Sequence, residues 1–464
     1  MENNLPSESR REFLKKSAAA AATTFFVPTI VPASVFGPNA PSNRITVGAI
    51  GTGRISREHD MPEIWKYDHA QIVAVCDLDS KRVQDAKQLV EKYYTDKKTK
   101  RFKGVKTYED YQELLGNKQI DAVVISTPDH WHAIPAIHAA AAGKDIYMQK
   151  PTSLTIAEGR LLSDHLRKTD RIFQIGSQQR SLNPWPQFKR ACELVRNGRI
   201  GKLTTVYVGL PGDPSGDDEP EMPVPKNLNY DRWLGSTPEV YYTEKRVHPQ
   251  ADYSRPGWLR CEQFGAGMIT GWGSHHVDIA HWGMDTEYTG PIEVSGWAEF
   301  PTSGLWNVHG KFQTEALYAN GVRMIVSNEL PNGVKFEGSD GWIFVTRGSG
   351  VTASDPSTGA GNTKVLNASD PKILSSVIGP DEVHLYESPE QHGNWLDSIR
   401  SRKPPVTNVE IAHRSCSACL VHHIAMKLKR KVYWNPEKEQ FKDDDEANRM
   451  LSRPMRAPYQ IASK

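Results

Sequence analysis

The residues with the clearest chemistry form a glycine-rich turn early in the chain. Gly51-Thr-Gly53-Arg54-Ile55-Ser56 has the spacing G-x-G-x-x-S. In a dinucleotide-binding turn the first glycine allows a tight bend, and the second lets the backbone approach a pyrophosphate. The helix that follows offers its N-terminal amides to the phosphate anion. Ser56 stands at the third position, where a small residue lets helix and strand pack closely.

Asp77 is the acidic residue expected to hold the ribose of such a dinucleotide. It ends the run Gln71–Asp77, which has the β-branched composition of a buried strand. It lies beyond the roughly 20-residue spacing expected for this acid, which an early insertion explains. An acid here favours NAD because it repels the 2′-phosphate of NADP, whereas Arg54 and Arg82 keep NADP open. The other interpretation of Asp77 is a helix N-cap.

The glycine turn and Asp77 need alternating strands and helices to position them. Strands are predicted at 44–51, 71–77, 120–127 and 145–151, and helices at 80–93 and 136–142. The alternation predicts a doubly wound parallel sheet of the Rossmann type, whose ligands bind beyond the carboxyl ends of the strands. The residues assigned to the cofactor come from the turn and from these strand ends: Gly51, Gly53, Arg54, Ile55, Asp77, Thr127, Pro128, His132, Gln149 and Lys150.

Longer motifs around these residues resemble one family. They are AIGTGRIS (Ala49–Ser56), STPDHWH (Ser126–His132), MQKPTSLTIAEGRLL (Met148–Leu162), GSQQRS (Gly176–Ser181) and GAGMITGWGSHHVDIAHW (Gly265–Trp282). Together they resemble the glucose–fructose oxidoreductase and inositol 2-dehydrogenase family, Gfo/Idh/MocA. The segment Glu410–Phe441 resembles a large exported bacterial branch of that family. The motifs say little about the substrate.

The resemblance implies a catalytic role for Lys150. Family members typically have Glu-Lys-Pro where this chain has Gln149-Lys150-Pro151. Their lysine points toward the nicotinamide and the substrate hydroxyl, where a cation stabilises the alkoxide that forms as hydride leaves. The change from Glu to Gln removes a negative charge beside Lys150, which would lower the lysine pKa or alter the cofactor contacts.

The second chemical motif of the family is an aspartate followed four positions later by a histidine that acts as the general base. Gly271 occupies the aspartate position here, and His275 occupies the histidine position. We therefore expect His275 to take the hydroxyl proton without the usual aspartate. Asp278 would lie one helical turn away, where it could orient an imidazole or form an ion pair. His276 could contact the substrate or pack within its helix.

Metal binding is the other chemistry open to this segment. His275, Asp278 and His281 follow one another at three-residue spacing and could line one side of a helix. Hydride transfer to a nicotinamide needs no metal, so we expect no metal site.

From about residue 175 the pattern is that of a second, α+β domain. A helix is predicted at 186–197, and strands at 203–209, 292–299, 311–319, 321–328, 334–338 and 341–347. Their alternation predicts an open, largely antiparallel sheet with one covered face. In the resembled family this sheet usually builds the subunit interface, which implies a homodimer or homotetramer. The polar segment 351–372 is predicted to be a surface excursion.

Three residues of this domain are substrate-side candidates by position: Arg180, Trp258 and Arg260. An arginine there would grip sugar hydroxyls or a carboxylate, or would form a structural ion pair.

Residues 1–40 are interpreted as a targeting signal and linker. Arg10 and Arg11 precede Phe-Leu-Lys and an apolar run, Ala18–Val31, and this order resembles the twin-arginine export signal. We therefore expect export to the periplasm by the twin-arginine machinery. The rest divides into an NAD(P)-binding domain (41–174), a substrate and oligomerisation domain (175–430) and a C-terminal extension that packs on the body (431–464).

Composition excludes several classes of protein. Lys and Arg number 57 against 55 Asp and Glu in 464 residues, and this balance argues against a nucleic-acid binder. We expect no stable membrane insertion of the mature chain. Five cysteines do not make a disulfide framework. Cys416 and Cys419 form a C-x-x-C in a helical run, which favours core packing over zinc or redox chemistry.

These observations predict an exported oxidoreductase that moves a hydride between a sugar or glycoside secondary alcohol and a tightly bound NAD, with NADP as an option. An NAD-dependent glycosidase, working by oxidation and elimination through a keto-sugar, is the alternative enzyme. A catalytically silent sugar- or nucleotide-binding protein is the third interpretation, because Gly271 and Gln149 depart from the family pattern.

Overall fold

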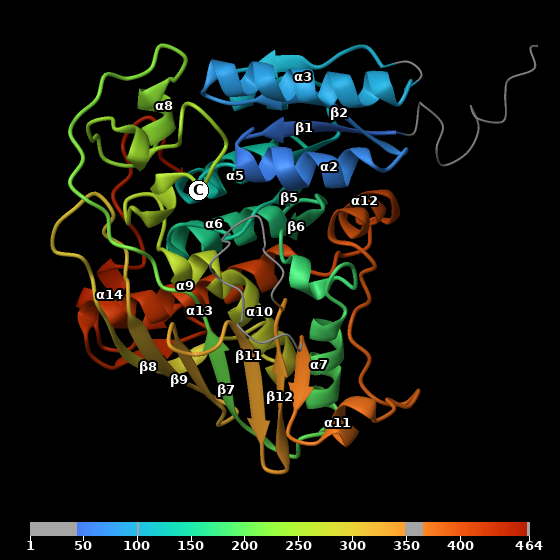
Figure 1. Ribbon diagram of the computed structural model, residues 1–464, viewed down its shortest axis with the longest axis vertical. Helices are drawn as coiled ribbons and strands as arrows, with labels where there is room; N and C mark the ends of the chain where they lie inside the picture. Colours follow the sequence, from blue (N-terminus) through green and yellow to red (C-terminus); the bar gives the residue numbers. More distant parts are fainter. Residues whose placement is uncertain (1–43, 100–101, 349–364, 462–464) are drawn as a thin grey trace, which may run out of the picture. The chain divides into compact units, whose positions relative to one another are not determined.

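The computed structural model describes residues 44–99, 102–348 and 365–461, so the targeting signal predicted at 1–40 lies outside the described residues. Ile45–Lys464 form one structural unit, and Figure 1 shows that it contains two sheets with helices between them. No described helix combines the length and the apolar character needed to span a membrane.

The first sheet is parallel and has the order β3-β2-β1-β4-β5-β6. The chain enters at the central strand, builds one half of the sheet and crosses over to build the other. This topology confirms the predicted Rossmann-type doubly wound sheet. The six strands are β1 (Ile45–Ile50), β2 (Ala70–Cys76), β3 (Lys106–Tyr108), β4 (Ala122–Ile125), β5 (Asp145–Met148) and β6 (Phe173–Ile175).

Helices connect these strands and cover the sheet. Their bounds are a π-helical turn at Ser56–Asp60, α2 (Met61–Trp65), α3 (Ser80–Asp96), α4 (Tyr111–Gly116), α5 (Ala133–Ala141) and α6 (Ile156–Arg167). The N-cap of α3 is Asp79, whose carboxylate accepts from the backbone amides of Lys81 at 3.0 Å and Arg82 at 3.3 Å. The interpretation of Asp77 as a helix N-cap is therefore wrong, and its carboxylate is available for other partners.

The second sheet has the order β13-β12-β11-β7-β10-β9-β8-β14-β15. Only β7 and β10 pair in parallel, so the predicted open and largely antiparallel sheet is confirmed. Its strands are β7 (Leu203–Gly209), β8 (Pro291–Ala298), β9 (Phe312–Tyr318), β10 (Arg323–Ser327), β11 (Gly333–Gly338), β12 (Gly341–Val345), β13 (Leu366–Ala368), β14 (Val432–Asn435) and β15 (Gln440–Phe441).

Strand β13 corrects one expectation. The segment 351–372 was expected to be a surface excursion, yet Leu366–Ala368 pairs with β12 as an edge strand. A three-residue strand is too short for a periodic signal, and the polar residues around it gave a loop pattern. Residues 349–364 of that segment lie outside the described residues.

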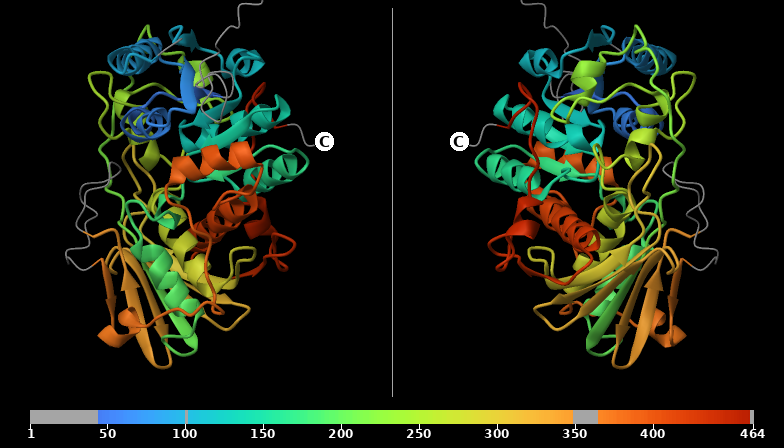
Figure 2. Two further views of the ribbon diagram at one scale, coloured as in Figure 1. Left: turned by 90° about the vertical axis from the view of Figure 1, so that its right-hand side faces the viewer. Right: turned by 90° about the vertical axis from the view of Figure 1, so that its left-hand side faces the viewer.

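Three helices cover one face of the large sheet and separate it from the Rossmann sheet: α7 (Gln187–Arg196), α10 (Gly273–Met284) and α13 (Val409–Leu428) (Figure 2). Every residue of α10 is buried. Cys416 and Cys419 are free thiols packed into this core from α13, as predicted for the C-x-x-C. Burial raises the pKa of Cys416 to about 11, so this thiol is protonated at neutral pH.

The chain returns to the Rossmann sheet near its end. Helix α12 (Gln391–Ser401) places Trp395, Leu396 and Ile399 in the core of that sheet beside α2. Part of the segment assigned to the second domain by sequence thus packs on the first. The short helices α8 (Tyr230–Leu234), α9 (Met268–Gly271), α11 (Pro371–Ser375) and α14 (Asp445–Arg449) complete the described α-helices.

Candidate active site

A cavity of about 860 Å³ opens at the carboxyl ends of the Rossmann strands and continues to the second domain. Its size suits a dinucleotide with a small second molecule. The predicted site residues that line it are Gly51, Gly53, Arg54, Ile55, Asp77, Thr127, Pro128, Gln149, Lys150, Trp258 and His275. The carboxyl ends of β1, β2, β4 and β5 supply most of the first nine, because parallel strands present these ends at one edge.

The glycine turn has the geometry of a pyrophosphate cradle. Gly51 has φ +83°, and a Cβ there would come within 2.8 Å of the Ser126 carbonyl carbon, so only glycine fits. A Cβ on Gly53 would meet nothing within 4 Å, which leaves open space for a close ligand. Ser56 is fully buried, as a small third residue should be.

Asp77 fixes the turn from the end of β2. Its Oδ2 accepts from the Thr52 amide at 2.7 Å and from the Thr52 hydroxyl at 3.1 Å. The carboxylate is held at the cavity wall where the ribose of a dinucleotide would lie. Arg82, which kept NADP open, donates to the carbonyl oxygens of Pro249 at 2.7 Å and Asp252 at 3.1 Å. The Arg82 guanidinium is therefore hydrogen-bonded to backbone of the protein itself.

His132 does not line the cavity but braces it. It is 1% exposed, with Nδ1 2.5 Å from the Pro151 carbonyl oxygen and Nε2 2.9 Å from the Thr127 carbonyl oxygen. Burial lowers the pKa of this imidazole to about 4, and the hydrogen bonds to the two carbonyl oxygens act in the opposite direction. It joins the loops that follow β4 and β5.

Lys150 follows β5 and reaches into the second domain. Its Nζ donates to the Gly271 carbonyl oxygen at 2.9 Å. Burial lowers the pKa of this ammonium, and the charges of Arg255 and Arg347 lower it further, while Asp129 acts in the opposite direction. Burial also raises the pKa of the Asp129 carboxyl group. The lysine is thus a desolvated cation at the cavity wall, suited to a developing negative charge.

His275 lies in the first turn of α10 and is 4% exposed. Burial holds its pKa well below the usual range, and the neighbouring charges of Arg347 and Lys150 act in the same direction. Its Nδ1 is buried and has no hydrogen-bond partner among the described residues. A neutral imidazole at the cavity wall can accept a proton.

Three other candidates on and near α10 lie outside the cavity. Arg180 and Asp278 pair with each other, with Nε to Oδ2 at 2.7 Å and Nη2 to Oδ1 at 2.8 Å. Glu287 is a second partner of the guanidinium. His276 directs Nδ1 to the Gly209 carbonyl oxygen at 3.0 Å. These contacts match the structural alternatives, an ion pair and a packed helix histidine, and none of the three residues lines the cavity.

Arg260 and the possible metal ligands are also held by contacts within the protein. Arg260 does not line the cavity, and its guanidinium stacks over Trp306 at 4.4 Å. The suggested metal run is likewise divided, because His281 Nε2 lies 2.8 Å from the Tyr318 hydroxyl while Asp278 binds Arg180. His275, Asp278 and His281 therefore do not converge on one point.

Arg347, just after β12, is a cavity residue that the sequence did not predict. It lines the cavity and stacks over Trp185 at 4.1 Å and Trp272 at 4.9 Å. Burial lowers its pKa to about 9. The only sequence signal was its place at a predicted strand end, in a domain whose strand ends carry no general rule for ligand binding.

Gln179 connects Arg347 to the histidines. With its amide turned so that both ends are satisfied, its oxygen accepts from Arg347 Nε at 2.9 Å and from His276 Nε2 at 3.2 Å. Its nitrogen then donates to the His275 carbonyl oxygen at 3.1 Å. The motif GSQQRS was noted in the sequence, but no role could be given to this glutamine.

Family models match two parts of the chain. Residues 45–177 match an oxidoreductase family with an NAD-binding Rossmann fold. Residues 215–359 and 362–461 match the C-terminal alpha/beta domain of that family.

Curated relatives match little more than a third of the chain. Inositol 2-dehydrogenase of Salmonella typhimurium is 27% identical over 164 residues, 35% of this chain and 45% of that protein. A glycosyl hydrolase family 109 protein of Shewanella pealeana is 29% identical over 171 residues, 37% of this chain and 36% of that protein. The chain spans less than half the length of the curated relatives it matches.

Solved structures match more of the fold at lower identity. The WlbA dehydrogenase of Chromobacterium violaceum, solved with NADH and UDP-GlcNAcA, has a TM-score of 0.59 at 16% identity and covers 84% of this chain and 96% of that one. Aldose-aldose oxidoreductase of Caulobacter crescentus, solved with glycerol, has a TM-score of 0.56 at 17% identity and covers 84% of this chain and 99% of that one. The chain belongs to the Gfo/Idh/MocA oxidoreductase family and carries its NAD-binding Rossmann domain.

Proposed function

We propose that this protein transfers a hydride between a secondary alcohol of a sugar or glycoside and NAD. The observation that carries the proposal is that Lys150 and His275 line the same cavity as the glycine turn, one from each domain. Bound NAD supplies the hydride acceptor. The chain's own residues then have to bind the alcohol, remove its proton and stabilise the oxygen.

His275 takes the hydroxyl proton, because burial keeps its imidazole neutral at the pH of the reaction. Lys150 stabilises the negative charge that develops on the oxygen. The hydrogen bond from Lys150 Nζ to the Gly271 carbonyl oxygen, 2.9 Å long, holds the cation beside the helix turn that leads to His275. Trp185, Trp258 and Trp272 line the cavity and offer apolar faces of the kind that stack on sugar rings.

The substitution Lys150→Met tests this role. We expect kcat/KM to fall by about 100-fold or more, as when an oxyanion donor is removed, while bound NAD is retained. The exposed lysine in Lys168→Met is the matched control and should leave kcat/KM unchanged. Activity of Lys150→Met equal to that of the control would contradict the assignment.

The identity of the cofactor is tested separately. The purified protein is denatured, and released nucleotide is identified by mass. NAD(H) that stays with the purified protein supports tight binding of the cofactor. Complete loss of NAD(H) on gentle dialysis contradicts tight binding. NADP(H) would correct the preference inferred from Asp77.

A glycosidase that uses NAD through a keto-sugar is the second candidate. It is favoured by the match to a glycosyl hydrolase family 109 protein, 29% identical over 171 residues. Release of nitrophenol from a nitrophenyl glycoside without an added electron acceptor would favour this candidate. Reduction of NAD with no released nitrophenol would favour the dehydrogenase.

Export and self-association complete the proposal. The pattern at Arg10, Arg11 and Ala18–Val31 supports transport of the folded protein by the twin-arginine machinery to the periplasm. The face of the large sheet opposite its helices carries half-buried Trp342 and Phe344, which supports a homodimer or homotetramer through that face. Cell fractionation and light scattering of the purified chain test these two points.

A further inference from the structure

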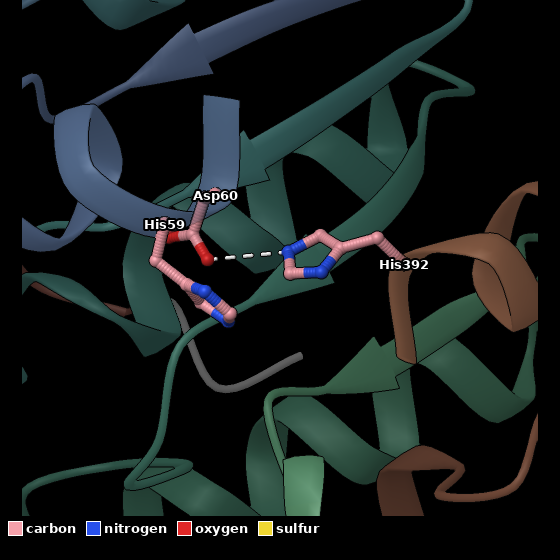
Figure 3. A group of neighbouring side chains, drawn as sticks. All are labelled: His59, Asp60 and His392. Carbon is pink, nitrogen blue, oxygen red and sulfur yellow. Dashed lines mark hydrogen bonds and ion pairs between the residues drawn. The ribbon is translucent and has the colours of Figure 1, made fainter. Parts of the chain in front are cut away.

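Three ionisable side chains that the proposed mechanism does not use meet at one wall of the cavity. His59 and Asp60 end the π-helical turn that follows the glycine turn, and His392 lies in the first turn of α12. Each offers one ligand atom, and these atoms all lie within 4.8 Å of one another. Figure 3 shows the Asp60 carboxylate and the His392 imidazole facing each other from two segments of the chain, with the His59 imidazole beside them.

We propose that His59, Asp60 and His392 bind a divalent transition-metal ion of the zinc class. Two imidazole nitrogens and one carboxylate oxygen are a donor set that Zn²⁺ takes in catalytic sites, and imidazole also suits Co²⁺ and Ni²⁺. The hard ions Mg²⁺ and Ca²⁺ prefer oxygen ligands and fit this set poorly.

Neighbouring side chains hold Asp60 and His392 in place. Asp60 is fully buried, and its Oδ1 accepts from Gln149 Nε2 at 2.7 Å while its Oδ2 accepts from Ser126 Oγ at 2.6 Å. The ring of His392 stacks on Tyr147 with centroids 4.1 Å apart. Such contacts fix the orientation of metal ligands and are typical of metal sites.

Gln149 is the neighbour that orients the Asp60 carboxylate. The resembled family typically has a glutamate at this position, and a carboxylate there would repel Asp60. The amide of Gln149 instead donates to Asp60, so it orients the carboxylate and leaves its charge in place. Glutamine thus replaces the glutamate of Glu-Lys-Pro at the position where the buried Asp60 carboxylate accepts a hydrogen bond.

The group has a direct route for the metal to enter. His59 and His392 both line the cavity. Three protein ligands leave at least one coordination position of a zinc-class ion unfilled. Because this position faces the cavity, an oxygen from water or from a hydroxyl-bearing ligand would fill it. The site therefore takes a metal whose remaining ligand is an oxygen in the cavity.

A metal-free ion pair is the competing interpretation. His392 Nε2 already lies 3.2 Å from Asp60 Oδ1, and a charged histidine there would satisfy the carboxylate alone. This interpretation assigns no part to His59. The two interpretations differ in the effect of removing His59 on metal binding.

The test uses the full chain. Metal content of the purified protein is measured by mass spectrometry, and the chelator-treated protein is titrated with Co²⁺ while its ligand-field absorption is recorded. We expect about one ion per chain, with binding weakened by about 100-fold or more in both His59→Ala and His392→Gln. The exposed histidine in His384→Gln is the matched control and should bind as the unaltered protein does.

Two results would overturn the proposal. One is a protein that holds no metal and binds no Co²⁺. The other is Co²⁺ binding that either variant keeps at full affinity. Circular dichroism and the amount of bound NAD are measured on every variant, so that a loss of folding is not mistaken for a lost ligand. Metal binding does not depend on the proposed hydride transfer, and either can fail alone.

Discussion

Replacing Arg180 by methionine should destabilise the protein and leave sugar binding largely intact. Arg180 was a candidate for gripping the substrate, yet its side chain is 1% exposed and that of Asp278 is 2% exposed. Methionine keeps much of the length and apolar surface of the arginine stem while removing the guanidinium. The substitution therefore separates an internal ion pair from a substrate contact.

The expected loss of stability follows from the hydrogen bonds that Asp278 and Glu287 lose when Arg180 is replaced. Asp278 loses two charge-assisted hydrogen bonds, of 2.7 and 2.8 Å, and keeps the Ser415 hydroxyl at 2.8 Å. Glu287 also loses a partner, although Arg196 lies 3.8 Å away. Breaking a buried pair by removing one partner costs about 3–5 kcal/mol. For 464 residues, an unfolding entropy of about 2.1 cal/mol/K per residue turns this into a drop of about 3–5 °C.

Arg167→Met is the matched control. Its guanidinium pairs with Asp164 at 2.7 Å, and the two side chains are 57% and 39% exposed. Exposed pairs contribute about 0–1 kcal/mol, so the midpoint of this control should fall by about 1 °C or less.

The assay is differential scanning calorimetry of both variants, with KM for the sugar measured on each. A midpoint lowered in Arg180→Met, with KM changed by less than about threefold, supports the internal pair. An unchanged midpoint with a KM raised by about tenfold or more would refute the reasoning, because the guanidinium would then act on the substrate and not on Asp278.

Three further predictions concern the cavity. Burial lowers the pKa of Lys150 to about 8, so its cation is lost as pH rises through that value and kcat/KM should fall above it; a profile flat to the ordinary lysine range would contradict this. Gly271→Asp should fold, since a Cβ there meets only Met268 Sδ at 3.7 Å, and its carboxylate should raise the pKa of His275 and move the acid limb of the pH profile upward by about one unit. Gly51→Ala forces a Cβ to within 2.8 Å of backbone at φ +83°, so calorimetric titration should show NAD bound about tenfold more weakly or worse.

The Rossmann half of the site could be predicted from sequence because its signals are local. Runs rich in β-branched residues end at Gly51, Asp77 and Pro128, and parallel strands bring such ends to one edge. Lys150 follows the same rule. The prediction needed no knowledge of which strands are neighbours.

The second half could not be predicted in this way. Every residue of α10 is buried, so its sequence has no polar face to indicate which side meets the cavity. His275 faces the cavity, while His276 meets β7 and Asp278 meets Arg180. These residues are near neighbours on one helix, and only the packing of three elements around it separates their roles.

The same reasoning explains why Arg347 and His392 were missed. Arg347 follows a strand of the large sheet, and His392 begins a helix whose Trp395 packs in the Rossmann core. His392 reaches the cavity because the C-terminal part of the chain returns to the first sheet, and Arg347 reaches it because the end of β12 lies beside the cavity. The cavity therefore has a cofactor wall specified by local sequence and a substrate wall specified by tertiary packing. Lys150, bonded to Gly271 at 2.9 Å, joins the two walls, so a change in either domain should shift the cation that the proposed chemistry requires.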